Sequence, residues 1–168
     1  VAGPYQFTHT ASHMAWYASV NALFFNRFKV DYSVVPWATF VDPEVARVGL
    51  SEAEAKEKDI AYEVYKYDLE DSDRAIADSA NKGFVKVLLA PGKDKILGAT
   101  IVASNASDLI AEFTLAMKHG LGLNKIMGTM HLYPSMMEAN KSVAGVWKNA
   151  TKPEWIMPYL QKFHAWRR

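Results

Sequence analysis

Hydrophobic and polar residues alternate with a period of two through the middle of the chain, a pattern typical of half-buried strands. The turn signal Asp42-Pro43 separates the first two runs, and a loop at 90–95 joins the last two as a hairpin. The runs lie at 37–41, 45–48, 61–69, 83–89 and 96–102. We therefore predict an antiparallel sheet of about four or five strands with one face covered.

Helical periodicity appears on both sides of these runs and between them. In the clearest helix, at 104–120, the apolar residues form a single stripe: Leu109, Ile110, Phe113, Ala116 and Met117. Ser51 and Glu54 have the spacing of a capping box that opens a short helix reaching about Lys58. Helices or helical turns are also predicted at about 8–26, 71–81, 123–128 and 134–149, and from a Thr151 cap onward with a break at Pro158. The predicted fold class is α+β, an antiparallel sheet flanked by helices.

Composition narrows the class of protein. The chain has 168 residues, half of them hydrophobic, and a net charge of +1. This length and hydrophobic content predict a single domain with a sizeable core. They do not indicate disorder, and the net charge does not indicate a nucleic-acid-binding surface. Its apolar runs are too short for a transmembrane segment. The chain contains no cysteine, which excludes disulfides and cysteine metal sites, so no metal site is predicted and a cytoplasmic location is the default.

Aromatic residues crowd the two ends of the chain: Tyr5, Phe7, Trp16, Tyr17, Phe24, Phe25 and Phe28, then Trp147, Trp155, Tyr159, Phe163 and Trp166. Such an excess predicts surfaces that another protein or domain covers, with ordinary core packing as the alternative for any one residue. The tail is also basic and amphipathic, ending Trp166-Arg167-Arg168. A membrane surface is one possible contact for it, but we favour packing on a parent enzyme or a dimer mate.

Three side chains with proton chemistry, His131, Tyr133 and Glu138, lie within eight residues around Pro134. An extended run before the proline predicts that His131 and Tyr133 share a face. Glu138 falls in the first turns of the following helix, where the helix dipole favours a carboxylate. The residues alone leave two interpretations open, a buried turn that satisfies backbone groups and a site with acid–base chemistry.

The segment 133–138 matches in spacing the His-Pro-Thr-x-x-Glu motif of the class I pyridine nucleotide-disulfide oxidoreductases, the group of glutathione reductase, lipoamide dehydrogenase and mercuric reductase. The chain resembles their C-terminal dimerisation domain over residues 5–148, including the run PWATFVDPEVARVGL that ends at Leu50. The resemblance implies a last helix of an FAD domain plus a connector at 1–35, a dimerisation domain at 36–150 and an amphipathic helix at 151–168. It also implies a symmetric homodimer whose interface includes the helices at 104–120 and 134–149.

In this family the motif's histidine shuttles a proton at the partner subunit's flavin and thiol pair, and the glutamate orients it. The matching residue here is Tyr133, and a phenol titrates near ~10 whereas an imidazole titrates near ~6.5. Tyr133 is therefore a poor base, and we expect it to donate a hydrogen bond to a reducible group while Glu138 accepts from it. His131 is the nearby imidazole able to substitute as base. The resemblance also predicts a cis peptide bond between Tyr133 and Pro134.

The same resemblance places Thr8, His9, Thr10 and Ala11 at the edge of a flavin, where a helix N-terminus faces the negative charge of the reduced ring. It implies FAD and NAD(P)H as cofactors of a longer parent oxidoreductase. This chain has no G-x-G-x-x-G and no cysteine pair, so by itself it is expected to be inactive and to retain neither cofactor. The alternative is a free-standing interaction module that binds another protein through its aromatic ends, without flavin or catalysis.

Overall fold

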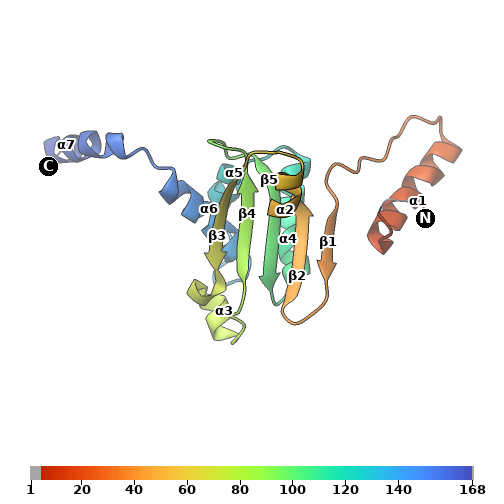
Figure 1. Cartoon of the computed structure of the whole chain (residues 1–168), viewed down its shortest axis with the longest axis horizontal. Coiled ribbons are helices and arrows are strands. Elements are labelled where there is room, and N and C mark those ends of the chain that lie inside the picture. Colours follow the sequence, from red (N-terminus) through yellow and green to blue (C-terminus); the bar gives the residue numbers. More distant parts are fainter. Residues whose placement is uncertain (1–4, 168) are drawn as a thin grey trace.

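The computed structural model describes residues 5–167 (the side chain of Glu154 excepted), and a five-stranded antiparallel sheet forms its centre (Figure 1). The strands follow the spatial order β1-β2-β5-β4-β3. Their bounds are β1 Pro36–Thr39, β2 Glu44–Gly49, β3 Glu63–Asp68, β4 Phe84–Leu89 and β5 Ile96–Ala103. The predicted α+β class and antiparallel sheet are confirmed.

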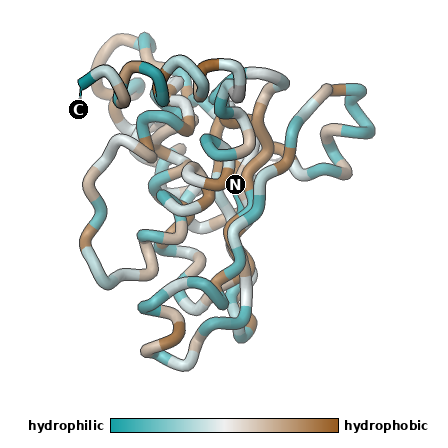
Figure 2. The backbone as a smooth tube through the Cα atoms, turned by 90° about the vertical axis from the view of Figure 1, so that its left-hand side faces the viewer, coloured by the Kyte–Doolittle hydropathy of each residue, from teal (hydrophilic) through white to brown (hydrophobic). Residues whose placement is uncertain are grey.

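Three helices cover one face of this sheet: α4 Ala106–Lys118, α5 Leu123–Gly128 and α6 Glu138–Ala150. Helix α4 packs on β1, β2 and β5, while α6 packs on β3 and β4. On this face the central strands contribute fully buried apolar side chains such as those of Val48, Val87 and Ile101, and Phe113 of α4 is buried in the same core. Figure 2 shows hydrophobic stretches of the chain running through the middle of the molecule.

The opposite face of the sheet is mixed, and Val45, Val102 and Phe84 share it with polar residues. A row of paired residues crosses all five strands: Trp37, Arg47, Thr100, Lys86 and Lys66. Helix α2 (Glu52–Glu57) begins at the predicted capping box and pairs its Glu52 with Lys86 at 2.7 Å. Helix α3 (Asp73–Ala77) follows β3 through the short 3₁₀ helix η1 (Leu69–Asp71). The cationic row is thus partly neutralised by carboxylates of the sheet's own domain.

The two end helices extend from the sheet on opposite sides (Figure 1). Helix α1 (Thr8–Leu23) has Thr10 as its buried residue, and helix α7 (Met157–Trp166) has none among its described residues. Most side chains of both helices are therefore exposed within the described chain. Val1–Pro4 and Arg168, at the ends of the predicted segments 1–35 and 151–168, lie outside the described residues.

Three helix boundaries differ from prediction. Helix α6 begins at Glu138 and not at Pro134, because residues 135–137 form tight turns in which each N–H from Glu138 to Asn140 bonds the carbonyl three residues earlier. Thr151 ends α6, its hydroxyl donating to the Trp147 carbonyl at 2.9 Å, and does not cap the next helix. The 3₁₀ helix η2 (Glu154–Ile156) precedes α7, and Pro158 occupies the first turn of α7, where its missing N–H disrupts no helical bond.

Candidate functional site

The turn before α6 displays apolar side chains to solvent. Met130 is 94% exposed, Leu132 80% and Tyr133 66%. The peptide bond between Tyr133 and Pro134 is cis, as predicted. Three large side chains that are exposed to solvent in one turn form a surface that a partner can cover. We call Met130, Leu132 and Tyr133 the apolar turn.

The phenol of Tyr133 donates a hydrogen bond to Oδ2 of Asp73, in α3, at 3.0 Å. The expected partner was Glu138, so the structure corrects that pairing. The hydrogen bond to the Asp73 carboxylate, together with its charge, raises the pKa of Tyr133 above the ordinary value of 10.0. Tyr133 is therefore protonated at neutral pH, and it can donate a proton in a hydrogen bond but cannot act as a base there.

Glu138 lies behind the turn as the first residue of α6. Its Oε2 accepts from the backbone N–H of Ser135 at 3.3 Å. The hydroxyl of Ser135 in turn donates to the carbonyl of Leu132 at 2.6 Å. Glu138 thus holds the backbone that carries Tyr133, and its negative charge sits at the positive end of the α6 dipole.

His131 points away from Tyr133 and into the protein, with a side chain only 4% exposed. Its Nε2 lies 2.9 Å from Oε1 of Glu112, in α4, and its Nδ1 lies 3.0 Å from the carbonyl oxygen of Thr129. The prediction that His131 and Tyr133 share a face is wrong, because residues 129–135 form bends and irregular backbone and not a strand. Both ring nitrogens are already engaged, so His131 is poorly placed to replace the motif's histidine as a base.

Glu112 and Asn140 complete this cluster, and neither was predicted as a site residue. The side-chain amide of Asn140 donates to Oε2 of Glu112 at 3.1 Å and to the carbonyl of Leu109 at 3.0 Å. Asn140 is fully buried. The sequence signal for this cluster is that Asn140 lies within the apolar stripe of α6. A buried amide requires polar partners, so such a residue indicates a polar contact inside the core.

At the other end of the molecule, the residues predicted to face a flavin form the first turn of α1. Thr10 has an internal role, because its hydroxyl donates to the carbonyl oxygens of Tyr5 and Phe7 at 2.9 and 2.8 Å. His9 places Nε2 2.9 Å from the carbonyl oxygen of Pro36, at the start of β1, and its ring stacks on that of Phe7. These contacts tie the start of α1 to edge strand β1.

The first backbone N–H groups of α1 have no acceptor within the helix, as at every helix N-terminus. Thr8 and His9 are exposed there, and both line a groove of about 920 Å³ between α1, β1 and α4. The groove's other walls are mostly apolar and include Trp37, Ile110 and Leu115. Exposed N–H donors beside an apolar wall suit a flat ring that carries an electron-rich carbonyl edge.

Tyr133 and the start of α1 lie at opposite edges of the sheet. Tyr133 is bonded to α3, which follows edge strand β3, whereas His9 is bonded to β1 at the other edge. Four inter-strand spacings of about 4.8 Å separate those edges by roughly 19 Å. No side chain bridges that distance, so Tyr133 cannot contact a group bound at its own chain's α1.

Comparison with known proteins identifies the domain. Residues 35–144 match the family model described as pyridine nucleotide-disulphide oxidoreductase, dimerisation domain. Dihydrolipoyl dehydrogenase of Chlamydia muridarum is 36% identical over 138 residues, 82% of this chain and 30% of the relative. The enzyme of the same name from Trypanosoma brucei brucei is 43% identical over 112 residues, 67% of this chain and 23% of the relative. The chain thus spans under a third of these relatives, and it belongs to the pyridine nucleotide-disulfide oxidoreductase family through its dimerisation domain.

Solved structures share the fold. LpdA from Mycobacterium tuberculosis matches with a TM-score of 0.78 at 24% identity, over 86% of this chain and 31% of that protein. The HOCl-induced flavoprotein disulfide reductase RclA from Escherichia coli matches with a TM-score of 0.75 at 22% identity, over 86% of this chain and 33% of that protein. Within residues 5–167, no helix is long and apolar enough to cross a bilayer, and no group of three or more His, Asp or Glu side chains is arranged to hold a metal ion.

Proposed function

We propose that this chain is the dimerisation part of an FAD- and NAD(P)H-dependent oxidoreductase, and that it contributes Tyr133 and Glu138 to the active site of its partner subunit. The separation of Tyr133 from the start of α1 carries this proposal. If α1 borders a flavin, Tyr133 of the same chain is too far away to serve it. A second copy, related by a twofold axis, can bring its own Tyr133 to that flavin.

A symmetric homodimer also explains the exposed apolar turn. Met130 and Leu132 are almost fully exposed, and Leu115 on the outer side of α4 is 59% exposed. Leu115 lies in the helix at 104–120 that was predicted to form part of the interface, whereas Met130 and Leu132 lie in the segment before the helix predicted at 134–149. An isologous interface buries such a patch twice, once on each subunit, and so gains apolar burial from both copies.

The chemistry proposed for Tyr133 is donation of a hydrogen bond. The raised pKa of Tyr133 keeps its phenol protonated across the neutral range. It can therefore stabilise negative charge that develops on a reducible group, as preorganised donors do in active sites. Glu138 holds the turn in position through Ser135 and makes no hydrogen bond to the phenol.

The residues at the start of α1 fit an FAD. Bound FAD supplies the redox chemistry, and the exposed N–H groups at Thr8 and His9 would face its carbonyl edge. The rest of the groove wall is mostly apolar, as the ring requires. The chain's share of this site is one helix end, so we propose that FAD and NAD(P)H bind the longer parent and that this part alone retains neither. We further propose residues 1–35, 36–150 and 151–168 as its three segments and the cytoplasm as its location.

Mixed dimers of the longer enzyme test the cross-subunit site. One subunit carries Thr8→Glu, which puts a carboxylate where reduced flavin is negative, and the other carries Tyr133→Ala. If each site combines α1 of one subunit with Tyr133 of the other, one site receives both changes and the second receives neither. The mixed dimer then keeps about half of the wild-type activity, although both homodimeric variants are impaired.

If Tyr133 serves its own subunit's flavin, both sites of the mixed dimer are damaged, and its activity lies midway between those of the two homodimeric variants. If the chain is instead a free-standing interaction module, no longer flavoprotein contains it. The control pair is Tyr62→Ala with Thr8→Glu, because Tyr62 is a half-buried tyrosine at the start of the β3 segment, outside this site. That mixed dimer retains about half of the activity in either arrangement.

A further inference from the structure

The C-terminal tail differs in charge from the rest of the chain. Residues 151–168 contain four Lys or Arg residues and one Glu, a net charge of +3. The whole chain has a net charge of +1, so the first 150 residues carry −2. The tail also lies beyond residue 144, where the family match ends. It is therefore a basic extension attached to a slightly acidic domain.

The aromatic residues of this tail form one ridge along α7 and the turn before it. Trp155, Tyr159, Phe163 and Trp166 are spaced by four, four and three residues, which places them on one side of a helix. Ring centroids lie 6.4 Å apart both from Trp155 to Tyr159 and from Phe163 to Trp166. All four side chains are exposed. The ridge therefore consists of two aromatic pairs on one side of the helix, and all four rings are exposed within the described chain.

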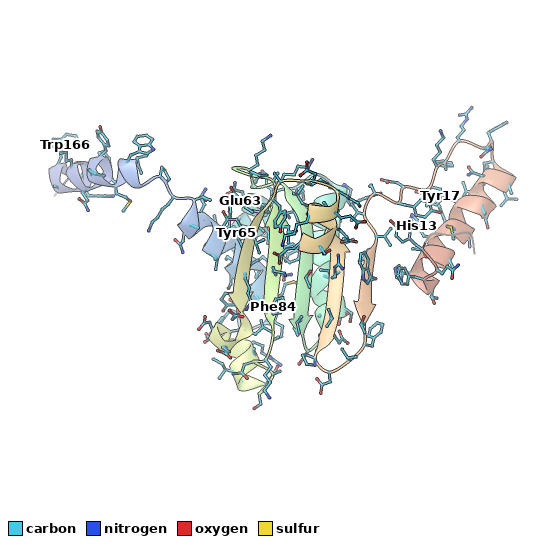
Figure 3. The ribbon with its side chains drawn as sticks, in the orientation of Figure 1. His13, Tyr17, Glu63, Tyr65, Phe84 and Trp166 are labelled. Atoms are coloured by element: carbon cyan, nitrogen blue, oxygen red, sulfur yellow. The ribbon has the colours of Figure 1, made fainter. Side chains whose placement is uncertain are left out.

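Basic residues border the ridge. On a helical projection Lys162 falls on one side of it and Arg167 on the other, and the guanidinium of Arg167 lies 5.6 Å from the centre of the Phe163 ring. Helix α7 packs only on η2 among the elements it contacts substantially, and it projects from the sheet beyond α6 (Figure 3). Trp166 marks its far end in that view. The tail can therefore reach a surface that the sheet domain does not touch.

We propose that α7 binds in the plane of an anionic lipid surface, with its aromatic ridge in the headgroup region and Lys162 and Arg167 at the lipid phosphates. Trp and Tyr concentrate at membrane interfaces, and long basic side chains extend from buried stems to charged headgroups. Ten residues span only about 15 Å, so the helix lies on the bilayer and does not cross it. The sequence alone favoured packing of this tail on a parent enzyme or a dimer mate. Its excess of positive charge and its exposed aromatic rings instead favour lipid phosphate over a neutral apolar groove of a protein.

The proposal does not depend on the redox chemistry proposed above. Flotation of the 168-residue chain with vesicles tests it, using phosphatidylcholine alone and phosphatidylcholine with ~30% phosphatidylglycerol. We expect binding to the anionic vesicles and little to the neutral ones. Lys162→Gln with Arg167→Gln weakens binding roughly 25-fold, about fivefold per cation removed. Phe163→Ala with Trp166→Ala weakens it at least as much, since it removes two large rings from the interface.

The matched control is Lys93→Gln with Lys95→Gln, which makes the same change in net charge in the exposed loop between β4 and β5. It should leave vesicle binding nearly unchanged. Equal loss in the control and the tail variant would overturn the proposal, because binding would then follow net charge and not the tail. Equal binding to both vesicle types would also overturn it. So would a tail that becomes buried in a second copy at rising protein concentration without vesicles, as seen by protection of Trp166 from acrylamide quenching.

Discussion

The buried side chain of His131 pairs with the partly buried Glu112 beneath the turn that carries Tyr133, with 2.9 Å between Nε2 and Oε1. The other ring nitrogen faces the Thr129 carbonyl, which can only accept a hydrogen bond. The imidazole thus connects a backbone carbonyl and a carboxylate, one through each ring nitrogen. The pair links α4 to the apolar turn, and through Asn140 it links both to α6. We therefore assign His131 the role of positioning the turn.

Removal of Glu112 should destabilise the domain strongly. Glu112→Ala leaves a buried imidazole and the amide of Asn140 without their acceptor, at a cost of about 3 kcal/mol. Glu112→Gln should cost far less, because its amide oxygen still accepts from Asn140 and its NH₂ group remains within reach of Nε2 of His131. Urea unfolding of both variants measures the difference. Equal losses in the two variants would show that packing, and not hydrogen bonding, determines the role of Glu112.

Asp73 should control the titration of Tyr133. The Asp73 carboxylate accepts from the phenol and raises the pKa of Tyr133, so Asp73→Asn should lower that pKa towards the ordinary value of 10.0. The phenol then ionises at a lower pH than in the wild-type chain. A titration of ¹³Cζ-labelled tyrosine by NMR measures the change. Asp78→Asn is the control, because Asp78 is paired with Arg74 at 2.6 Å and should leave Tyr133 unaffected.

Most of the fold could be predicted because its signals are local. The alternation in β4 and β5, the stripe in α4 and the capping box at Ser51 each depend on residues within one element. Prediction of helix boundaries failed where a residue is compatible with two local structures. Thr151 could cap a helix on either side, and the choice follows from its contact with Trp147. Pro134 could open a helix, but the hydrogen bonds of Ser135 delay the start of α6 to Glu138.

The site was less predictable because its partners are distant in sequence. Asp73 lies 60 residues from Tyr133, and Glu112 lies 19 residues from His131. Spacing along the chain carries no information on such pairs until the sheet order and helix packing are known. Motif spacing found Tyr133 and Glu138, but the acceptor of the phenol could be identified only from the fold.

The capping box of α2 should make stability depend on pH in the acid range. Hydrogen bonds from the backbone and hydroxyl of Ser51, with help from Arg47, lower the pKa of Glu54 from 4.5 to about 2. A lowered folded-state pKa gives stability that is complete above pH 4.5 and is lost as pH falls towards 2. Glu54 is 38% exposed, so solvent screening limits the effect to about 1 kcal/mol. Glu54→Gln should flatten this part of a stability–pH curve measured by urea unfolding, whereas Glu57→Gln should not.

A charge in the apolar turn should dissociate the proposed homodimer. Leu132→Glu places a carboxylate in an interface whose twofold symmetry brings in a second copy of it, so each dimer gains two buried charges. Leu132 is 80% exposed in the single chain, so folding should be nearly unaffected. Sedimentation velocity should show a dimer for the wild-type chain and a monomer for the variant. Leu121→Glu, at a half-exposed leucine after α4, is the control; if it dissociates the dimer equally, the interface does not centre on the apolar turn.

Replacing Tyr133 with histidine in the longer enzyme should change the pH dependence of catalysis. The family motif has histidine at this position, and an imidazole titrates near ~6.5, whereas the phenol of Tyr133 has a pKa raised above 10.0. Tyr133→His therefore introduces a group that can exchange a proton at neutral pH. We expect kcat/KM for a small disulfide to rise about 10²-fold, with a new ionisation between about pH 6 and 7.

Tyr133→Phe separates this effect from simple loss of the hydroxyl. It removes the proposed hydrogen bond without supplying a base, and it should lower kcat with little change in the pH profile. Tyr62→His is the matched control, because it adds an imidazole outside the site. If Tyr133→His has the same profile as the wild type, no proton moves at position 133 during turnover. Tyr133 would then serve the dimer interface alone, together with Met130 and Leu132.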